Sequence, residues 1–303
     1  MIEHEEFLAT IERARNCLKS PVQGTVAHDL RQALDQLQAH VRRRPRVVLL
    51  GEINSGKSTL ANALLGFGLL PESVLHNTRI PVVLRHGKTY GATIVAHGGR
   101  RLRLDLSDSE IRGAEAAKSV EIELPTVSLA SFEIVDTPGI GNYRDLAMLA
   151  LTERDIVVWC TVANQAWKES ERRIWEAMPP RTWRQAVLVV TNADLIAEPK
   201  AIGRVVARLR SETNGLFRDV MITGKPAEAP NPPTERWVGI EAVERCISEI
   251  VSAKAAQKAR TGQRLATRIL RGAEQLKEMS NGTALPASGV TKDERPVMER
   301  RCP

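Results

Sequence analysis

The sequence predicts an α/β protein in which helices flank a doubly wound, mostly parallel sheet, with a helical bundle beside the sheet. Short apolar stretches alternate with amphipathic ones over residues 45–230, which is the pattern of strands and helices around a parallel sheet. A glycine-rich stretch follows the first apolar run. One-sided helical patterns occur at 1–44 and 231–280. Such helices are stable when they bury their apolar stripes together, so we expect them to form one bundle.

The individual elements follow from the spacing of apolar residues. Two amphipathic helices are expected over 5–19 and 26–41. Eight apolar stretches predict strands at 46–50, 80–85, 90–96, 101–106, 120–124, 131–136, 155–162 and 186–191. Further helices are expected at 59–66, 143–153, 168–178, 199–213, 240–251 and 265–276. Residues 281–303 lack periodicity, and we expect them to be disordered.

Composition narrows the possible partners and compartments. The 303 residues carry a formal charge of +7, which suits an anionic partner or a basic solvated surface. The four cysteines are far apart and form no metal-ligand spacing, as in proteins of a reducing cytosol. The chain has no apolar run near the length of a membrane span and no signal peptide pattern. We therefore expect a cytoplasmic protein, with the inner face of the membrane as a candidate location.

A phosphate-binding loop follows the first predicted strand. Gly51-x-x-x-x-Gly56-Lys57-Ser58 matches the P-loop pattern, with an apolar run before it and a helix-forming run after it. The glycines let successive backbone N–H groups turn toward phosphate oxygens, and the helix N-terminus adds partial positive charge. Lys57 would bridge the outer phosphates, and the Ser58 hydroxyl would ligate magnesium. The candidate nucleotide-binding residues here are Glu52, Asn54, Ser55, Gly56, Lys57, Ser58 and Thr59.

Later segments indicate a guanine nucleotide through their order along the chain. One apolar strand ends in Asp136, which can hold a magnesium-bound water, and the Gly139 N–H can sense the terminal phosphate. Another ends in Thr-Asn-Ala-Asp at 191–194. The Asp194 carboxylate can accept both hydrogen bonds that guanine offers from N1–H and its 2-amino group, whereas adenine offers no such pair. The candidate base-binding residues are Thr191, Asn192, Asp194, Gly224 and Lys225.

Over residues 44–226 the chain resembles the dynamin family of large GTPases, particularly its bacterial members. The phosphate loop "GEINSGKST" is similar to theirs, and "VLHNTRIPVVL" resembles their first switch and the strand after it. The stretches "VEIELPTVSLASFEIVDTPGIGN" and "QAWKESERRIW" resemble the segments that follow in the family. The resemblance implies magnesium-dependent GTP hydrolysis, nucleotide-linked dimerisation through the GTPase domains and, often, membrane remodelling.

Carried over residue by residue, the resemblance implies a role for each position. Thr78 would be the switch threonine that ligates magnesium and orients the attacking water. Ser58 would also ligate magnesium, and Asp136 would act on it through water. Asn54 occupies the place where related GTPases hold K⁺ or Na⁺ against the phosphates, and this charge can replace an arginine finger; the alternative is an asparagine that caps its own turn. The implied catalytic residues are Lys57, Thr78, Gly139 and Asn54.

Three positions depart from the family pattern. Ile53 stands where eukaryotic dynamins have a catalytic glutamine, and Ile140 stands where Ras-like proteins have one. With no obvious base beside the water, we expect slow turnover by the isolated monomer. Asn192 replaces the usual lysine whose stem packs over the purine. This change should weaken guanine binding without altering the preference for guanine, because Asp194 remains.

The helices and partners leave alternatives open. A bundle that transmits the nucleotide state suits a homodimer formed through the GTPase domains, or a heteromer with another GTPase. The basic helical face at 254–271 could meet anionic lipid or a protein, or be a solvated outer face. An Era-like GTPase associated with ribosome or tRNA is a second hypothesis, but the 11 aromatic residues offer no stacking set, which disfavours nucleic acid. A third is a GTP-binding scaffold that hardly hydrolyses.

Overall fold

The computed structural model describes most of the chain and divides it into two units. Its described residues are 2–19, 24–66, 80–104, 117–141, 145, 151–183, 185–196, 198–224 and 238–280. One unit combines residues 1–42 with 258–303, and the other comprises residues 43–257. The latter, called here the sheet unit, carries the predicted phosphate loop. The former is the helical unit, and no described helix of either unit is long and apolar enough to cross a bilayer.

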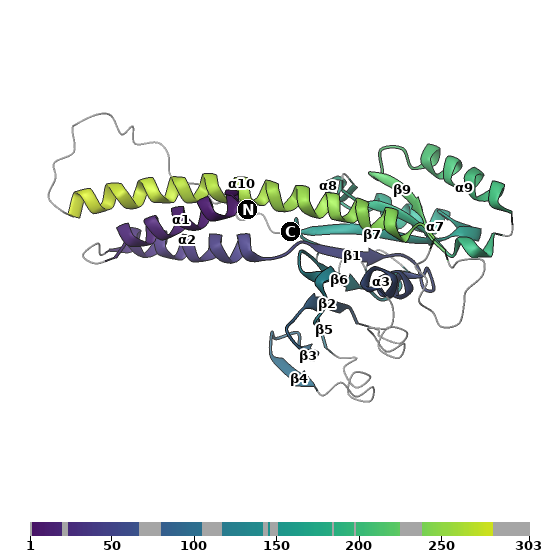
Figure 1. The fold of residues 1–303 in the computed structure, drawn as a ribbon, viewed down its shortest axis with the longest axis horizontal. Helices are drawn as coiled ribbons and strands as arrows, with labels where there is room; N and C mark the ends of the chain where they lie inside the picture. The colour runs from purple at the N-terminus through teal and green to yellow at the C-terminus, as the bar shows by residue number, and fades with distance from the viewer. Residues whose placement is uncertain are drawn as a thin grey trace. The chain divides into compact units, whose positions relative to one another are not determined.

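The sheet unit is built on nine strands in the order β4-β3-β5-β2-β6-β1-β7-β8-β9. Their bounds are β1 Arg46–Leu50, β2 Val82–His86, β3 Gly91–Val95, β4 Arg101–Leu104, β5 Ser119–Leu124, β6 Glu133–Asp136, β7 Asp155–Val162, β8 Val187–Thr191 and β9 Asp219–Ile222. From β6 to β9 all neighbours are parallel, as are β2 and β5. The pairs β2–β6, β3–β4 and β3–β5 are antiparallel. The predicted α/β class with a mostly parallel sheet is confirmed (Figure 1).

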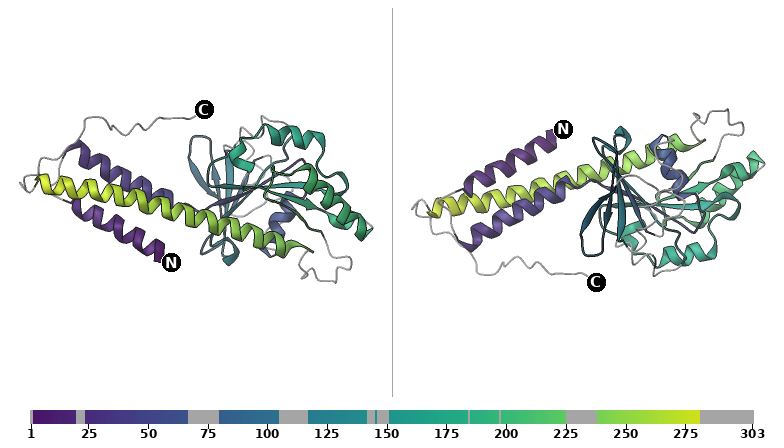
Figure 2. Two further views of the ribbon diagram at one scale, coloured as in Figure 1. Left: turned by 90° about the horizontal axis from the view of Figure 1, so that it is seen from above. Right: turned by 90° about the horizontal axis from the view of Figure 1, so that it is seen from below.

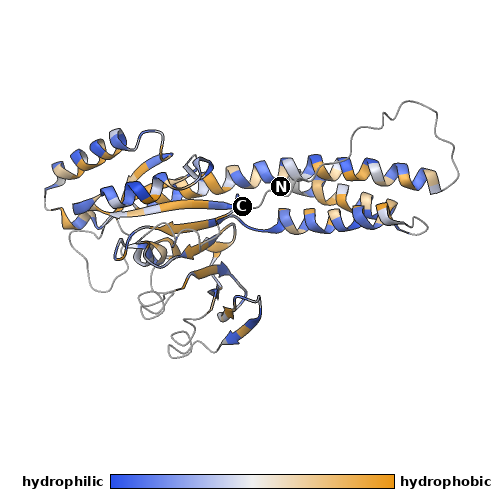
Figure 3. Ribbon diagram, turned by 180° about the vertical axis from the view of Figure 1, so that it is seen from behind, coloured by the Kyte–Doolittle hydropathy of each residue, from blue (hydrophilic) through white to orange (hydrophobic). Residues whose placement is uncertain are grey.

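Helices cover both faces of this sheet because its central strands are apolar on both sides. In β1, Val47 and Leu49 belong to one buried cluster with α3 (Lys57–Leu65) and the first part of α10 (Ile240–Ser280). Val48 and Leu50 belong to the opposite cluster, with α7 (Glu169–Glu176), α8 (Pro180–Trp183) and α9 (Pro199–Glu212). Figure 3 shows these central strands as largely apolar ribbons. Continuous apolar runs of this kind are typical of a doubly wound sheet.

The helical unit packs three helices around one small apolar core. They are α1 (Ile2–Cys17), α2 (Thr25–Arg42) and the second part of α10, which lie side by side in both views of Figure 2. Phe7, Ile11, Leu34 and Leu270 are among the buried residues. A Cβ on Gly262 would lie 2.7 Å from Val41 Cγ2, so glycine at this position allows α10 its close approach to α2.

Helix α10 differs from the sequence expectation. The separate helical patterns at 240–251 and 265–276 form one helix of 41 residues. Its first apolar residues, such as Ile240 and Ile247, pack in the core of the sheet unit. Residues 240–257 therefore belong with the sheet, whereas the expected bundle segment began at 231. The apolar stripe was predicted, but not the change of packing partner along it.

The remaining differences are local. The predicted helix at 143–153 lies mostly outside the described residues, and its described end, residues 151–153, forms a loop and turn. Asp155 accepts hydrogen bonds from the backbone N–H and the hydroxyl of Thr152, which closes that turn. Helix α8 has only four residues and was not predicted. The expected disordered tail at 281–303 lies outside the described residues.

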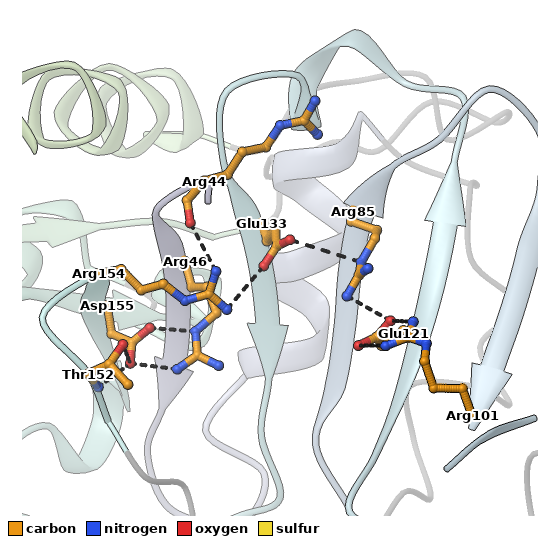
Figure 4. Close-up of polar contacts among 9 residues, drawn as sticks. All are labelled: Arg44, Arg46, Arg85, Arg101, Glu121, Glu133, Thr152, Arg154 and Asp155. Carbon is orange, nitrogen blue, oxygen red and sulfur yellow. Dashed lines mark hydrogen bonds and ion pairs between the residues drawn. The ribbon is translucent and has the colours of Figure 1, made fainter. Parts of the chain in front are cut away.

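An arginine network starts at the amino ends of β1, β6 and β7 and continues across β2 and β5 to β4 (Figure 4). Arg46 of β1 binds Asp155 of β7 with both Nε and Nη2, at 2.5 and 2.7 Å. The network continues through ion pairs of Arg154 and Arg85 with Glu133, at 3.6 and 4.0 Å. Arg85 also binds Glu121 at 2.7 Å, and Arg101 of β4 binds the same carboxylate. Charged side chains thus tie strands together at the edge opposite the phosphate loop.

Candidate nucleotide site

The phosphate loop connects β1 to α3 through a backbone path that requires glycine at both ends. Gly51 has φ of 145°, and a Cβ there would lie 2.3 Å from the Cys160 carbonyl oxygen. Gly56 has φ of 80° and lies against Thr191, where a Cβ would be 3.0 Å from side-chain atoms. Asn54, at φ 61°, also adopts the left-handed conformation. The loop is therefore wrapped tightly over the ends of β7 and β8.

Lys57, the first residue of α3, is buried beneath this loop. Its ammonium donates to the carbonyl oxygens of Gly51 and Glu52, at 3.1 and 2.6 Å, and to Ser55 Oγ at 3.3 Å. Burial lowers the pKa of Lys57, and the nearby Asp136 and Glu52 carboxylates only partly oppose this effect. An ammonium whose direct contacts are neutral oxygens keeps positive charge available for an anion, which suits a phosphate-binding lysine.

Ser58 and Asp136 meet although they are far apart in sequence. The Ser58 hydroxyl donates to Asp136 Oδ2 at 2.7 Å. Asp136 is the last residue of β6, and Thr137 fixes the following turn by donating to the Leu49 carbonyl at 2.6 Å. A hydroxyl and a carboxylate side by side offer the oxygen ligands that magnesium prefers. Thr59, in the first turn of α3, is half-buried.

The predicted second switch packs directly on the phosphate loop. Ile140 donates its N–H to the Gly51 carbonyl at 3.0 Å. A Cβ on Gly139 would lie 2.4 Å from Ile53 Cγ1 and 2.6 Å from Ile53 Cα, so a side chain at 139 would displace the loop. Ile140 is buried, whereas Ile53 is 73% exposed. No polar side chain stands at either position.

The predicted base loops also lie together. A Cβ on Gly224 would be 2.9 Å from Asp194 Oδ1 and from the N–H nitrogen of Asp194, so the loops after β8 and β9 touch. Asn192 has φ of 53°, and this left-handed conformation turns the chain directly after β8. Thr191 Oγ1 donates to the carbonyls of Ser55 and Thr161, at 2.9 and 3.2 Å, and so joins the base side to the phosphate loop. Thr78 and Lys225 lie outside the described residues.

The sequence did not indicate the contacts of Glu52. Its carboxylate accepts from Lys168 Nζ at 3.0 Å and from Ser170 Oγ at 2.6 Å, both at the start of α7. Nearby, buried Glu171 accepts hydrogen bonds from Trp159 Nε1, Thr161 Oγ1 and the Lys168 N–H. The local pattern Lys168-x-x-Glu171 could have indicated a capping carboxylate at the helix start, but not its link to the loop.

The family comparison agrees with this geometry. The model of the dynamin family matches residues 47–193, which include β1, the phosphate loop, β6, β7 and β8. This region is similar to the GTPase domain of the dynamin family. Its fold is a dynamin-like GTPase fold with a P-loop, and the predicted resemblance is confirmed.

Relatives match the dynamin-family region but are longer proteins. Isoniazid-induced protein IniC of Mycobacterium tuberculosis is 33% identical over 149 residues, which cover 45% of this chain and 30% of that protein. Dynamin-like protein 2 of Campylobacter jejuni is 25% identical over 179 residues, covering 56% and 29%. The bacterial dynamin-like protein of Nostoc punctiforme is 30% identical over 153 residues, covering 43% and 22%. The chain spans less than half the length of these relatives.

A solved structure extends the similarity in fold beyond the dynamin-family region. It is described as an oligomerised bacterial dynamin pair that provides a mechanism for long-range sensing and tethering of membranes. The TM-score is 0.60, with 18% sequence identity, over 93% of this chain and 58% of that one. At this identity the match establishes a shared fold.

Proposed function

We propose that this chain binds GTP with magnesium and hydrolyses it to GDP and phosphate. The observation that carries the proposal is the convergence of three predicted elements at the carboxyl ends of β1, β6 and β8. They are Lys57 beneath the loop, the Ser58–Asp136 hydrogen bond, and Asp194 against Gly224. Ligands of open α/β sheets bind at this edge, and the dynamin-family match supports the same reading.

The proposed division of roles follows the site. Ser58 and, through water, Asp136 would hold magnesium, which supplies positive charge to the outer phosphates when it is bound. Thr78 is proposed as a further magnesium ligand. The backbone N–H groups of the loop would cradle the phosphates, with Lys57 facing the outer ones. The Gly139 N–H would contact the terminal phosphate, as its packing against the loop permits.

Hydrolysis in this proposal depends on backbone groups and positive charge. Since Ile53 and Ile140 provide no polar side chain, Thr78 and the Gly139 N–H would orient the attacking water. Asn54 is proposed as a ligand for K⁺ or Na⁺ against the phosphates, and its left-handed conformation is equally suited to capping a turn. We expect slow turnover by a monomer and faster turnover in a dimer formed through the GTPase domains, or in a heteromer.

The guanine assignment has a specific test. Asp194→Asn exchanges an acceptor-only carboxylate for an amide that has an acceptor oxygen and an NH2 donor group. Xanthine carries an oxygen where guanine carries its 2-amino group, so the variant should lose GTP and bind xanthosine triphosphate. We expect a shift in preference on the order of a hundredfold or more, since buried polar groups left unpaired discriminate strongly. If the variant binds both nucleotides as the wild type does, Asp194 does not contact the base.

The reaction is tested by measuring the GTPase rate per molecule against protein concentration, in potassium and in lithium buffers, with ATP and a Thr78→Ala variant as controls. A rate that rises with concentration and needs potassium supports dimer-stimulated hydrolysis and the role of Asn54. Tight GTP binding with a flat, very low rate would favour a GTP-binding scaffold. Equal use of ATP would contradict the guanine site.

The last part of the proposal is a peripheral contact with a membrane. The similar bacterial dynamin pair tethers membranes, as its description states, and we propose a peripheral contact for this chain as well. Four exposed cationic side chains lie along the second part of α10: Arg260, Arg264, Arg268 and Arg271. Sedimentation with anionic vesicles, compared with neutral ones, tests the contact. Equal recovery of the protein with both vesicle types would contradict it.

A further inference from the structure

Glu52 places a negative charge inside a loop that is built to bind anions. It is the second residue of the phosphate loop, and its own carbonyl oxygen accepts a hydrogen bond from Lys57 Nζ at 2.6 Å. Two like charges a few ångströms apart repel each other, and repulsion is stronger where protein replaces water. An ionised Glu52 that turned toward the phosphates would therefore weaken their binding.

Two side chains at the start of α7 hold both oxygens of this carboxylate. Ser170 Oγ donates to Oε1 at 2.6 Å, and Lys168 Nζ donates to Oε2 at 3.0 Å. Partial burial tends to raise the pKa of Glu52, but the contacts with Ser170 and Lys168 and the charge of Lys57 together lower it. The carboxylate is ionised, held on the side of the loop that faces α7, and partly neutralised there.

Buried hydrogen bonds hold the backbone that carries Lys168 and Ser170. Trp167 has φ of 62°, an uncommon conformation for a bulky residue. Its N–H donates to Thr161 Oγ1 at 3.0 Å, and the Lys168 N–H donates to buried Glu171 at 2.9 Å. A strained turn that is held by buried hydrogen bonds is a typical pre-organised element at a functional site.

We propose that Lys168 and Ser170 form a latch that holds Glu52 away from the phosphate site, and that the latch sets the affinity of the loop for a nucleoside triphosphate. The inference rests on the proposed function, because the phosphates are those of the proposed GTP. Lys168 and Ser170 are positioning residues in this scheme. Releasing Glu52 would let its carboxylate, whose charge already acts on Lys57, turn toward the phosphates and compete with them for the ammonium.

A rescue experiment tests the latch. Binding of GDP and of the thiotriphosphate analogue of GTP is measured by calorimetry, with magnesium, for the wild type, Lys168→Ala, Glu52→Gln and the double variant. Lys168→Ala should weaken the triphosphate roughly tenfold and GDP less, because GTP carries more charge near the loop. The double variant should return to within about twofold of the wild type, since the neutral amide no longer repels phosphate. Lys168→Arg should keep the affinity.

Other outcomes would overturn the latch. Either unchanged affinity in Lys168→Ala, or a double variant that loses as much affinity as Lys168→Ala does, would show that Glu52 does not oppose binding. The exposed pair Arg15–Asp35 of the helical unit, at 2.6 Å, is the matched control: Arg15→Ala and its combination with Asp35→Asn should leave both affinities unchanged.

A second measurement separates the latch from the proposed function. A double-mutant cycle on Glu52 and Lys168 in urea, without nucleotide, reports whether the two side chains interact. Additive effects would refute the contact itself. A wild type that binds neither guanine nucleotide would refute the proposed function and the effect of the latch on affinity, while the cycle in urea would still decide whether the latch forms.

Discussion

The two edges of the central sheet treat charge in opposite ways. At the amino edge, Arg46 and Asp155 form a two-point ion pair, and the Asp155 side chain is 2% exposed. At the carboxyl edge, the buried Lys57 ammonium is bound by two carbonyl oxygens and a hydroxyl. No carboxylate of the described residues lies within ion-pair distance of it. Buried charge is paired directly at the amino edge, whereas the buried ammonium of Lys57 at the carboxyl edge has no direct ion pair with a carboxylate of the described residues.

This difference separates stability from function within one sheet. A buried charge with an ionic partner is costly to break, because the remaining partner is then buried alone. A buried charge held by neutral oxygens costs stability and gains most when an anion arrives. The amino edge should therefore respond to mutation mainly in unfolding, and the carboxyl edge mainly in binding.

The largest effect is expected for Lys57→Met. The variant removes the buried ammonium and keeps most of its volume, so GTP affinity should fall on the order of a hundredfold or more. The free energy of unfolding should stay within about 1 kcal/mol of the wild type or increase, because an apolar side chain has no charge to desolvate. Nucleotide titration and urea unfolding of the same preparation measure the two effects. A large loss of stability would mean that Lys57 is primarily structural.

The next largest effect is expected for Asp155→Ala. This variant should lose stability and keep its affinity for GTP, the reverse of Lys57→Met. Removing this carboxylate leaves Arg46 partly buried without its ion pair, which should cost about 3 kcal/mol of unfolding free energy. GTP affinity should stay within about twofold of the wild type, since the network lies at the far edge. Arg46→Ala combined with Asp155→Ala should cost less than the sum of the two single changes. If Asp155→Ala lost as much GTP affinity as Lys57→Met, the two edges of the sheet would be energetically coupled.

Sequence alone predicted the elements whose signal is local. Strand β1 was expected at 46–50 and occupies Arg46–Leu50, because a strand buried on both faces reads as one apolar run. Helix α9 was expected at 199–213 and occupies Pro199–Glu212, where proline starts it. The continuity of α10 was missed, since no pattern marks where a single helix changes the core into which it packs.

The candidate site likewise has parts that the sequence predicted and contacts that it did not. The phosphate loop and the segment at 191–194 were visible because each is contiguous in sequence. The partners of Glu52 were not visible, since Lys168 and Ser170 lie 116 and 118 positions away from it in sequence. No spacing rule connects a loop after one strand to a helix after another. Contacts that depend on the folded sheet need the structure.

A smaller effect, on the pH dependence of stability, separates a buried carboxylate from an exposed one. Glu171 is held by neutral donors, and burial raises its pKa above 4.5 despite hydrogen bonds from Trp159, Lys168 and Thr161. Its stabilising contribution is therefore complete below about pH 4.5 and is lost as pH rises through the folded-state pKa. Glu171→Gln should remove this slope, which cannot exceed about 1.4 kcal/mol per pH unit. Urea unfolding from about pH 4 to pH 8 measures it.

The matched control is exposed Glu169, whose pKa is lowered by its hydrogen bond with Arg173. A lowered pKa has the opposite sign, because its contribution is present at higher pH and is lost as pH falls through the folded-state value. Glu169→Gln should therefore change the profile in the acid range. Identical profiles for Glu171→Gln and the wild type would mean that Glu171 does not titrate as its burial implies.

The smallest effect is expected at the outer end of the arginine network. Arg101 binds Glu121 but is 51% exposed, and exposed ion pairs contribute little because water and salt screen them. Arg101→Ala should lower the free energy of unfolding by less than about 1 kcal/mol, and the loss should shrink further in roughly 1 M salt. Urea unfolding of Arg101→Ala and Asp155→Ala at low and high salt compares the loss of unfolding free energy at the exposed end of the network with the loss at its buried end. If both variants lost the same stability, the network would act as one cooperative unit, and the compensation of charge at the amino edge would extend to its solvent-exposed strands.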